Sequence, residues 1–273
     1  MNRNKGYRAE PLSFNRRAVI ASASVTSERN VIHTLTEIDV SEPRRLIKEY
    51  RIKTGEKLSF TAYIVSCLAE TLKDHPDMNS FIKGRKLIRL DDITISVLLE
   101  KTIEGENVPE PIGIQQAGKK DYFQIHREIR EAASRKTDQL GKLSENGWIR
   151  WIPAFLMKRF IRWADKNIRM ARTYGKIAVT AVGMFGNDAA WFIPHGSATI
   201  LITVGSIVER PVEQDGQYDS REHLCLTASF DHDIVDGAPA ARFMKQFSET
   251  VRSGRLLAEP ILSDKNARNE EKK

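Results

Sequence analysis

The sequence lacks the marks of a secreted or membrane-spanning chain. It has only two cysteines, Cys67 and Cys225, and their separation fits neither a disulfide framework nor a CxxC zinc or redox pair. No apolar run approaches the roughly 18 to 20 residues that span a bilayer. Residues 1–10 have no apolar stretch after their basic residues, so we expect no secretory signal. The composition predicts a soluble protein of a reducing compartment, with a cytoplasmic location.

Internal repeats and linkers rich in proline, glycine or serine are also missing. The 273 residues are enough for one large domain or two small ones. Hydrophobic residues make up 41% and charged residues 29%, a globular balance that argues against a disordered chain. We therefore expect a single domain over residues 11–262, preceded by a flexible N-terminus at residues 1–10 and followed by a disordered polar tail at residues 263–273.

Hydrophobic periodicity predicts strands and helices in irregular alternation. β-branched runs and partial alternation predict strands at residues 31–40, 93–99, 177–182, 198–208 and 223–230. Apolar residues at helical spacing predict helices at residues 44–54, 59–72, 122–135 and 239–251. This mixture indicates a mixed α/β (α+β) domain.

Positive charge is concentrated in one segment, residues 148–172. The chain has 43 Lys and Arg against 36 Asp and Glu, a formal charge of +7, and the segment holds seven basic residues with Asp165 as its only acidic one. Three of the four tryptophans lie there too. Such a stretch either packs on its own domain, which we favour, or contacts an anionic membrane. A phosphate-bearing cofactor is a further acidic partner that fits. Signatures of the common nucleic-acid modules are missing, so we expect no nucleic-acid partner.

Residues 229–243 carry the candidate chemistry. A predicted strand leads into His232, an Asp-Gly turn follows, and a helix begins after it. A histidine at a strand end, with an unperturbed pKa of about 6.5, suits general-base work on a hydroxyl or a thiol. From these residues alone, a structural role for the histidine and the turn aspartate stays open. The flanking Asp231 and Asp233 would alternate in direction on a strand and not converge on one ion, so we expect no metal site.

The octapeptide DHDIVDGA at residues 231–238 resembles the HxxxDG active-site motif of the catalytic domain of dihydrolipoyl acyltransferases, the acyl-transferring components of 2-oxo acid dehydrogenase complexes. Chloramphenicol acetyltransferase shares that motif and fold. Four further stretches resemble the family in the same order: PLSFNRRAVI at 11–20, VIHTLT at 31–36, HPDMN at 75–79 and VTAVGMFG at 179–186. The likeness covers residues 11–258.

The resemblance implies a chloramphenicol acetyltransferase-like fold, a two-layer mixed sheet with flanking helices. It implies that His232 is the general base and that Asp236 is mainly structural, bridged to an arginine for which Arg16 is the best match. Gly237 belongs to the same structural support. Thr180 falls where the family has a serine whose hydroxyl supports the tetrahedral oxyanion, and a threonine keeps that donor. A strand threonine without a chemical duty is the alternative.

The resemblance also implies coenzyme A, as acyl-CoA co-substrate, and an acceptor thiol or hydroxyl. It implies a homotrimer, or a multiple of trimers, in which His232 faces Thr180 of a neighbour. Complex-forming members carry lipoyl and peripheral subunit-binding domains that are missing before residue 11, and residues 148–172 look like an insertion. We therefore expect a free-standing acyltransferase without a covalently attached lipoyl group, acting on a small acceptor or on a lipoyl domain in trans. The alternative is a non-catalytic scaffold that keeps the fold and binds a membrane or a partner.

Overall fold

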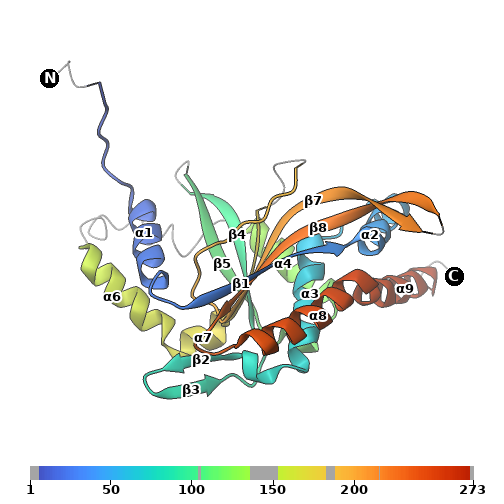
Figure 1. The fold of residues 1–273 in the computed structure, drawn as a ribbon. Helices are drawn as coiled ribbons and strands as arrows, with labels where there is room; N and C mark the ends of the chain where they lie inside the picture. Colours follow the sequence, from blue (N-terminus) through green and yellow to red (C-terminus); the bar gives the residue numbers. More distant parts are fainter. Residues whose placement is uncertain (1–5, 104–105, 136–152, 183–187, 215, 271–273) are drawn as a thin grey trace.

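A computed structural model describes residues 6–103, 106–135, 153–182, 188–214 and 216–270 (Figure 1). In this part of the chain, a six-stranded mixed sheet and a two-stranded hairpin are flanked by helices. The predicted mixed α/β fold class is thereby confirmed. The large sheet consists of β1 (Val31–Asp39), β4 (Ile95–Ile103), β5 (Glu106–Ile114), β6 (Ile177–Ala181), β7 (Ile200–Gln214) and β8 (Gln217–Asp231), and the hairpin of β2 (Ser80–Lys83) and β3 (Lys86–Arg89).

The strand order of the large sheet is β1-β8-β7-β6-β4-β5. Strand β6 pairs parallel with β4 on one side and with β7 on the other. The other three pairings, β1 with β8, β7 with β8 and β4 with β5, are antiparallel. The long β7–β8 hairpin contains a register shift between Val204 and Ile207. Because Val31 lies opposite Asp231, the start of β1 and the preceding loop lie beside the end of β8, where the motif begins.

The helices lie in two groups (Figure 1). In the first group, four helices contact the large sheet: α2 at β8, α3 at β6, α4 at β4 and α8 at β1. Helix α9 packs against α2 and α3. At the other end of the molecule α6 packs against α1 and α7. The helices are α1 (Phe14–Thr26), α2 (Ser41–Thr54), α3 (Phe60–Lys73), α4 (Tyr122–Ser134), α6 (Ala154–Asp165), α7 (Ile168–Tyr174), α8 (Gly237–Ser253) and α9 (Arg255–Glu270).

Helix α3 is the central helix of the core, as its continuous apolar composition predicts. The Ser59 hydroxyl accepts the backbone N–H of Ala62 at 3.2 Å and caps its first turn. Ile64 and Leu68 are completely buried and belong to one cluster with Val179 of β6. Burying such side chains stabilises the fold by about 1.5–3 kcal/mol each, so this helix fixes the sheet face that it covers.

The opposite side of each strand carries smaller and more polar residues. Thr180, Thr203 and Thr227 are in register on β6, β7 and β8 and form a row across the sheet. Residues 188–196 lie against the sheet beside this row, because Ser206 accepts the backbone N–H of Ala190 through its hydroxyl at 2.9 Å. The Trp191 indole N–H donates to the backbone carbonyl of Thr36 on β1 at 3.0 Å. This segment therefore spans from the β7 bulge to the edge strand.

The structure overturns one expectation about the ends of the chain and confirms one about the surface only in part. The tail predicted to be disordered from residue 263 continues helix α9 as far as Glu270; completely buried Leu257 anchors the start of that helix, and Lys, Arg, Ala and Glu residues further along favour helix. The basic segment packs on its own domain with one side, where α6 contacts α1 and Met157 is buried. Its residues Phe155, Phe160 and Trp163 are not buried and are 68%, 61% and 58% exposed, and Trp148 and Trp151 lie outside the described residues. In the part of the chain that the structure describes, no helix has the length and apolarity needed to cross a membrane.

Candidate active site

His232 lies in a tight turn between β8 and α8. The carbonyl of Asp231 accepts the backbone N–H groups of Ile234 and Val235 at 3.0 and 2.9 Å, and its carboxylate accepts the N–H of Asp233 at 3.2 Å. These bonds close the turn around the last residue of the strand. The imidazole is exposed at the surface of the chain, so the turn presents it outward on a fixed backbone.

The loop between α1 and β1 supports this turn from the side. The carbonyl of Asn30 accepts the backbone N–H of His232 at 2.8 Å, and its side-chain amide donates to Asp233 at 3.0 Å. Arg29 donates to the carboxylate of Asp231 at 2.6 Å. Arg29 and Asn30 thus hold the turn through three hydrogen bonds, one to the backbone of His232 and two to the side chains of the residues on either side of it.

Arg29 also belongs to a buried cluster of four charged side chains. Its second guanidinium nitrogen donates to Asp165 of α6 at 2.5 Å, and the Lys176 ammonium donates to the same carboxylate at 2.6 Å. The Asp165, Lys176 and Asp231 side chains are only 7%, 6% and 6% exposed. Two cations therefore face two carboxylates in a largely buried site, and this links α6 to the His232 turn.

The two carboxylates of this cluster respond differently to their surroundings. Burial raises the pKa of Asp231 above its ordinary value, and the single guanidinium of Arg29 offsets this only in part. Burial also acts to raise the pKa of Asp165, but the charges of Lys176 and Arg29 outweigh burial and lower it. Asp165 is therefore the carboxylate that the cluster holds most firmly in its ionised form.

The other predicted support residues lie near the turn or apart from it. Asp236 precedes the first residue of α8, and its backbone carbonyl accepts the N–H of Ala240 at 3.0 Å. Its carboxylate is exposed and makes no capping bond to the helix. Gly237 begins the helix, and a Cβ added there would meet nothing within 4 Å. Arg16 lies exposed on α1, and among the contacts of the described residues there is no Arg16–Asp236 ion pair, so that bridge stays a prediction.

Thr180 lies on β6, away from the His232 turn of the same chain. It is 9% exposed. Thr180 lies opposite Thr203 of β7, and Thr203 lies opposite Thr227 of β8. His232 follows Thr227 by five residues. That distance along a strand is roughly 15 Å, and two steps between strands add roughly 10 Å across the sheet. The two side chains therefore do not meet within one chain.

Sequence reasoning missed Arg29, Asn30 and Lys176 as parts of the site. Lys176 lies 5.1 Å above the Phe81 ring as well as beside Asp165. No local pattern marks these residues, because their partners are far away in sequence. Among the described residues, no group of three or more His, Cys, Asp or Glu side chains is arranged to hold a metal ion.

Comparison with known proteins identifies the family. A sequence profile described as 2-oxoacid dehydrogenases acyltransferase (catalytic domain) matches residues 4–146 and 165–258. The gap between the two ranges, residues 147–164, contains most of α6 and falls largely within the segment expected to be an insertion.

Curated relatives agree with the profile. The dihydrolipoyllysine-residue acetyltransferase component of the pyruvate dehydrogenase complex of Staphylococcus aureus (strain Mu50) is 28% identical over 251 residues, which cover 88% of this chain and 51% of that protein. The component of Staphylococcus epidermidis (strain RP62A) is 28% identical over the same length, covering 88% of this chain and 50% of that protein. The chain thus spans about half the length of the curated relatives it matches.

Solved structures share the fold. A probable dihydrolipoamide acetyltransferase from Listeria monocytogenes superposes with a TM-score of 0.67 at 25% identity, covering 91% of this chain and 95% of that one. The Azotobacter vinelandii dihydrolipoamide acetyltransferase, in which the role of a serine, a histidine and an asparagine in the catalytic mechanism was investigated, superposes with a TM-score of 0.68 at 20% identity, covering 94% and 96%. Because the profile matches most of its residues, this chain belongs to the family of 2-oxoacid dehydrogenase acyltransferase catalytic domains.

Proposed function

We propose that this chain is an acyltransferase that moves an acyl group between coenzyme A and a thiol or hydroxyl acceptor, with His232 as the general base. The observation that carries the proposal is the His232 turn itself. Its backbone is held by Asn30 and Arg29, and its imidazole is exposed to a substrate. A general base needs a fixed position and access to the proton that it removes, and this turn supplies both.

The proposed reaction uses two side chains in separate roles. His232 takes the proton of the acceptor S–H or O–H, and the acceptor atom attacks the thioester carbonyl carbon of acyl-CoA. The hydroxyl of Thr180 donates to the oxyanion of the tetrahedral intermediate. The C–S bond then breaks, and the departing coenzyme A thiolate receives the proton from the imidazolium. In the reverse direction the same groups acylate coenzyme A.

The proposed site requires two subunits. Since Thr180 and His232 of one chain are separated by roughly 15 Å along the strands and roughly 10 Å across them, Thr180 can act with His232 only across an interface. We therefore propose a homotrimer, or a multiple of trimers, with the site between neighbours. In the Azotobacter vinelandii enzyme the investigated serine, histidine and asparagine are spaced by 52 and 4 residues. Thr180, His232 and Asp236 have the same two spacings, which supports the assignment of roles.

The acceptor is proposed by class. Dihydrolipoamide, free or on a lipoyl domain supplied by another chain, fits a family whose curated relatives are dihydrolipoyllysine-residue acetyltransferases. A non-catalytic scaffold that keeps the fold is the second candidate, and the exposed apolar residues of α6 favour it, because a binding protein needs such a surface.

The test measures coenzyme A release from acetyl-CoA and longer acyl-CoAs by mass spectrometry, with and without dihydrolipoamide. General-base catalysis contributes about 10²–10⁴ to rate, so we expect His232→Ala to reduce acceptor-dependent release at least a hundredfold. His223→Ala is the matched control: it removes a histidine from β8, nine residues before His232, and should keep wild-type turnover. A His232→Ala protein that folds normally and keeps more than a tenth of the activity would exclude His232 as the base. Absence of release with every donor would favour the scaffold.

A further inference from the structure

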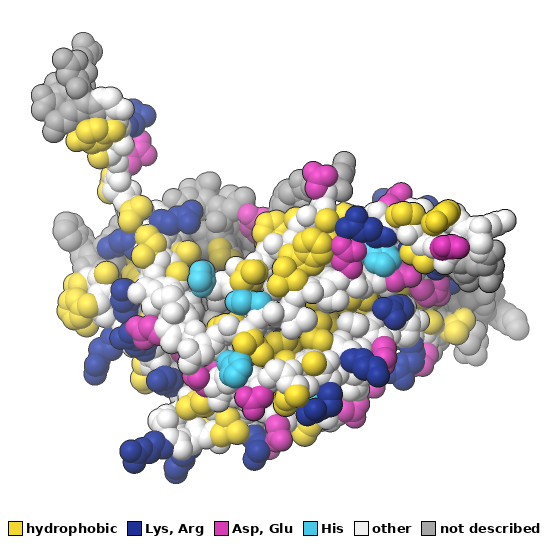
Figure 2. Space-filling model, in the orientation of Figure 1, with side chains coloured by type: hydrophobic (Ala, Val, Ile, Leu, Met, Phe, Trp, Pro, Cys, Tyr) yellow, Lys and Arg dark blue, Asp and Glu magenta, His cyan; other side chains and the backbone are white. Residues whose placement is uncertain are grey.

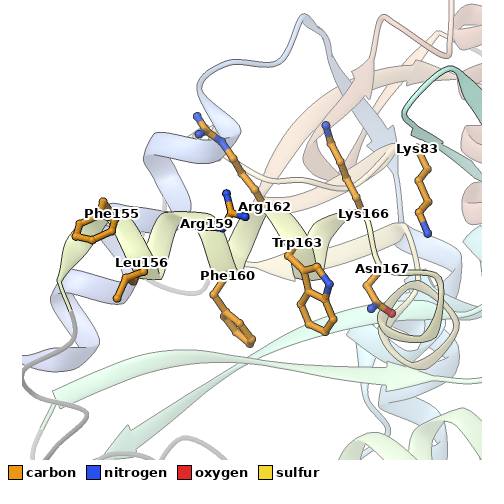
Figure 3. A pocket seen from close by; sticks show the side chains of 9 residues that line it. All are labelled: Lys83, Phe155, Leu156, Arg159, Phe160, Arg162, Trp163, Lys166 and Asn167. Carbon is orange, nitrogen blue, oxygen red and sulfur yellow. The ribbon is translucent and has the colours of Figure 1, made fainter.

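Helix α6 has an apolar outer face that no described part of the chain covers. Phe155, Leu156, Phe160 and Trp163 are 68%, 45%, 61% and 58% exposed. They line an open cavity of about 750 Å³ together with Lys83 of the β2–β3 hairpin and basic residues of the helix. Figure 3 shows Leu156, Phe160 and Trp163 projecting from one side of α6 and Arg162 and Lys166 from the other. Large apolar side chains gathered on one face mark a surface for another molecule.

The exposed charge of this helix is of one sign. Its basic residues are Lys158, Arg159 and Arg162, and Lys166 follows at its end. The only acidic residue of the helix, Asp165, is buried in the cluster with Lys176. Figure 2 likewise shows Lys and Arg side chains gathered around α1 and α6, whereas both signs are interspersed around β7, β8 and α2. The surface is therefore both apolar and cationic.

The orientation of this face is fixed by the rest of the fold. Met157 on the opposite side of α6 is 8% exposed, and the helix packs against α1. Asp165, at its C-terminal end, is held by Arg29 and Lys176. The helix cannot turn its apolar residues inward without breaking these buried ion pairs. Within the part of the chain that the structure describes, these contacts fix the apolar face in its exposed position.

The same helix lies outside the part of the chain that the family profile matches. The profile skips residues 147–164, which include nearly all of α6. An interface that the family shares, such as one between copies, would be formed by the matched core. The face of α6 is therefore suited to a partner specific to this chain.

We propose that the outer face of α6 docks on an anionic phospholipid surface. An amphipathic helix binds such an interface when aromatic and aliphatic residues enter the boundary of the acyl chains while flanking Lys and Arg residues contact the headgroups. Phe155, Leu156, Phe160 and Trp163 supply the first group, and Arg159, Lys166 and Lys83 the second. Negative surface charge attracts each such cation. This inference does not depend on the proposed acyl transfer.

The test is co-sedimentation of the full chain with vesicles of phosphatidylcholine alone and of phosphatidylcholine with about one third phosphatidylglycerol, whose negative surface charge attracts basic residues. We expect the wild type to bind the anionic vesicles at least tenfold more strongly. Phe160→Ser/Trp163→Ser, which removes apolar contacts, should weaken that binding at least tenfold, and so should Arg159→Gln/Lys166→Gln, which removes two cations.

Matched controls change equally exposed residues elsewhere. Ile52→Ser/Tyr218→Ser replaces apolar side chains that are 75% and 77% exposed, and Lys57→Gln/Lys245→Gln removes two exposed cations; both should bind within twofold of the wild type. The proposal fails if the wild type does not prefer anionic vesicles, or if the controls lose as much binding as the α6 variants. It also fails if Phe160→Ser/Trp163→Ser leaves vesicle binding unchanged but dissociates an oligomer in sedimentation velocity, because the face would then join copies of this chain.

Discussion

At the residue scale, Thr180 and His232 place different demands on the fold. The histidine needs exposure and a braced backbone, which the loop of Arg29 and Asn30 provides. The threonine needs only that one hydroxyl be held in place. Thr180 lies in a row with Thr203 and Thr227, on a strand that is paired on both sides. These pairings hold the backbone of Thr180 more firmly than the end of a strand or a loop would.

The first prediction concerns this hydroxyl. Thr180→Val keeps the volume of the side chain and removes the donor, so we expect the turnover number to fall about 10²–10³-fold, the cost of losing one oxyanion donor. Thr180→Ser keeps the donor and should retain activity within about an order of magnitude of the wild type. The measurement is the steady-state rate at saturating acyl-CoA and acceptor, with thermal unfolding as a check on folding. Equal activity of the valine and serine variants would show that Thr180 has only a structural role.

From sequence, candidate residues could be grouped where they are close together or fall in a known motif. His232 and Asp236 lie in one motif, which makes them candidates together, and their roles stay predictions. The ion pairs of Arg29 join residues 136 and 202 positions apart, and no local pattern encodes such a pairing. They exist because the sheet places the start of β1 beside the end of β8. Knowledge of strand order was needed to find them.

At the element scale, strong periodicity was sufficient, and elements whose pattern is interrupted or weak were not recognised. The buried helix α3 and the strands β1 and β6 lie close to the predicted ranges, whereas β8 begins at Gln217, six residues before the predicted range of 223–230. Strand β5 was missed because Pro109 and Pro111 interrupt it. Proline cannot donate to a sheet ladder and is tolerated on edge strands, and β5 is the edge. Helix α1, whose surface is only partly apolar, was missed as well.

The second prediction concerns the bulge of β7. A Cβ added at Gly205 would lie 2.3 Å from the carbonyl oxygen of Ala190 and 2.6 Å from that of Cys225. Both are backbone atoms, so neither moves without displacing the segment at residues 188–196 or strand β8. We expect Gly205→Ala to lower the free energy of unfolding by about 1–3 kcal/mol, the usual cost of overpacking, measured by urea denaturation.

Gly237→Ala is the matched control for that measurement. Its added Cβ meets nothing within 4 Å, and the position is the first residue of α8. We expect its stability to change by less than about 0.5 kcal/mol, as surface substitutions usually do. If Gly205→Ala were as stable as this control, the segment at residues 188–196 would not be packed as tightly against the bulge as the contacts indicate.

At the scale of the whole molecule, the buried charge cluster joins parts that are otherwise held by separate contacts. Arg29 comes from the loop before β1, Asp165 from the end of α6, Lys176 from the start of β6 and Asp231 from the end of β8. Removing one partner of a buried ion pair leaves an uncompensated charge, which costs about 3–5 kcal/mol. The cluster therefore makes the position of α6 and the stability of the whole fold depend on one carboxylate.

The last prediction concerns that carboxylate and its dependence on pH. The folded state lowers the pKa of Asp165 below its ordinary value of 3.8, so its stabilising effect is complete above that value and is lost as the pH falls through the folded pKa. We expect Asp165→Asn to reduce the free energy of unfolding by about 3–5 kcal/mol at pH 7. The difference from the wild type should shrink steadily below about pH 4, because the unfolded wild-type chain then binds a proton at Asp165 that the folded chain does not, until the folded carboxylate is protonated as well.

Urea denaturation of both proteins measures this difference directly. The measurements run from pH 2.5 to 7 in steps of about one pH unit. Other carboxylates with shifted pKa values, such as Glu37, whose pKa Arg210 lowers, and Asp231, whose pKa burial raises, titrate in both proteins and largely cancel in the comparison. Glu28→Gln removes an exposed partner of Arg162 on the outside of α6 and should change stability by less than about 1 kcal/mol at any pH. A difference between wild type and Asp165→Asn that stayed constant down to pH 2.5 would mean that Asp165 acts through its shape and hydrogen bonds, and that its charge does not hold α6 to the sheet.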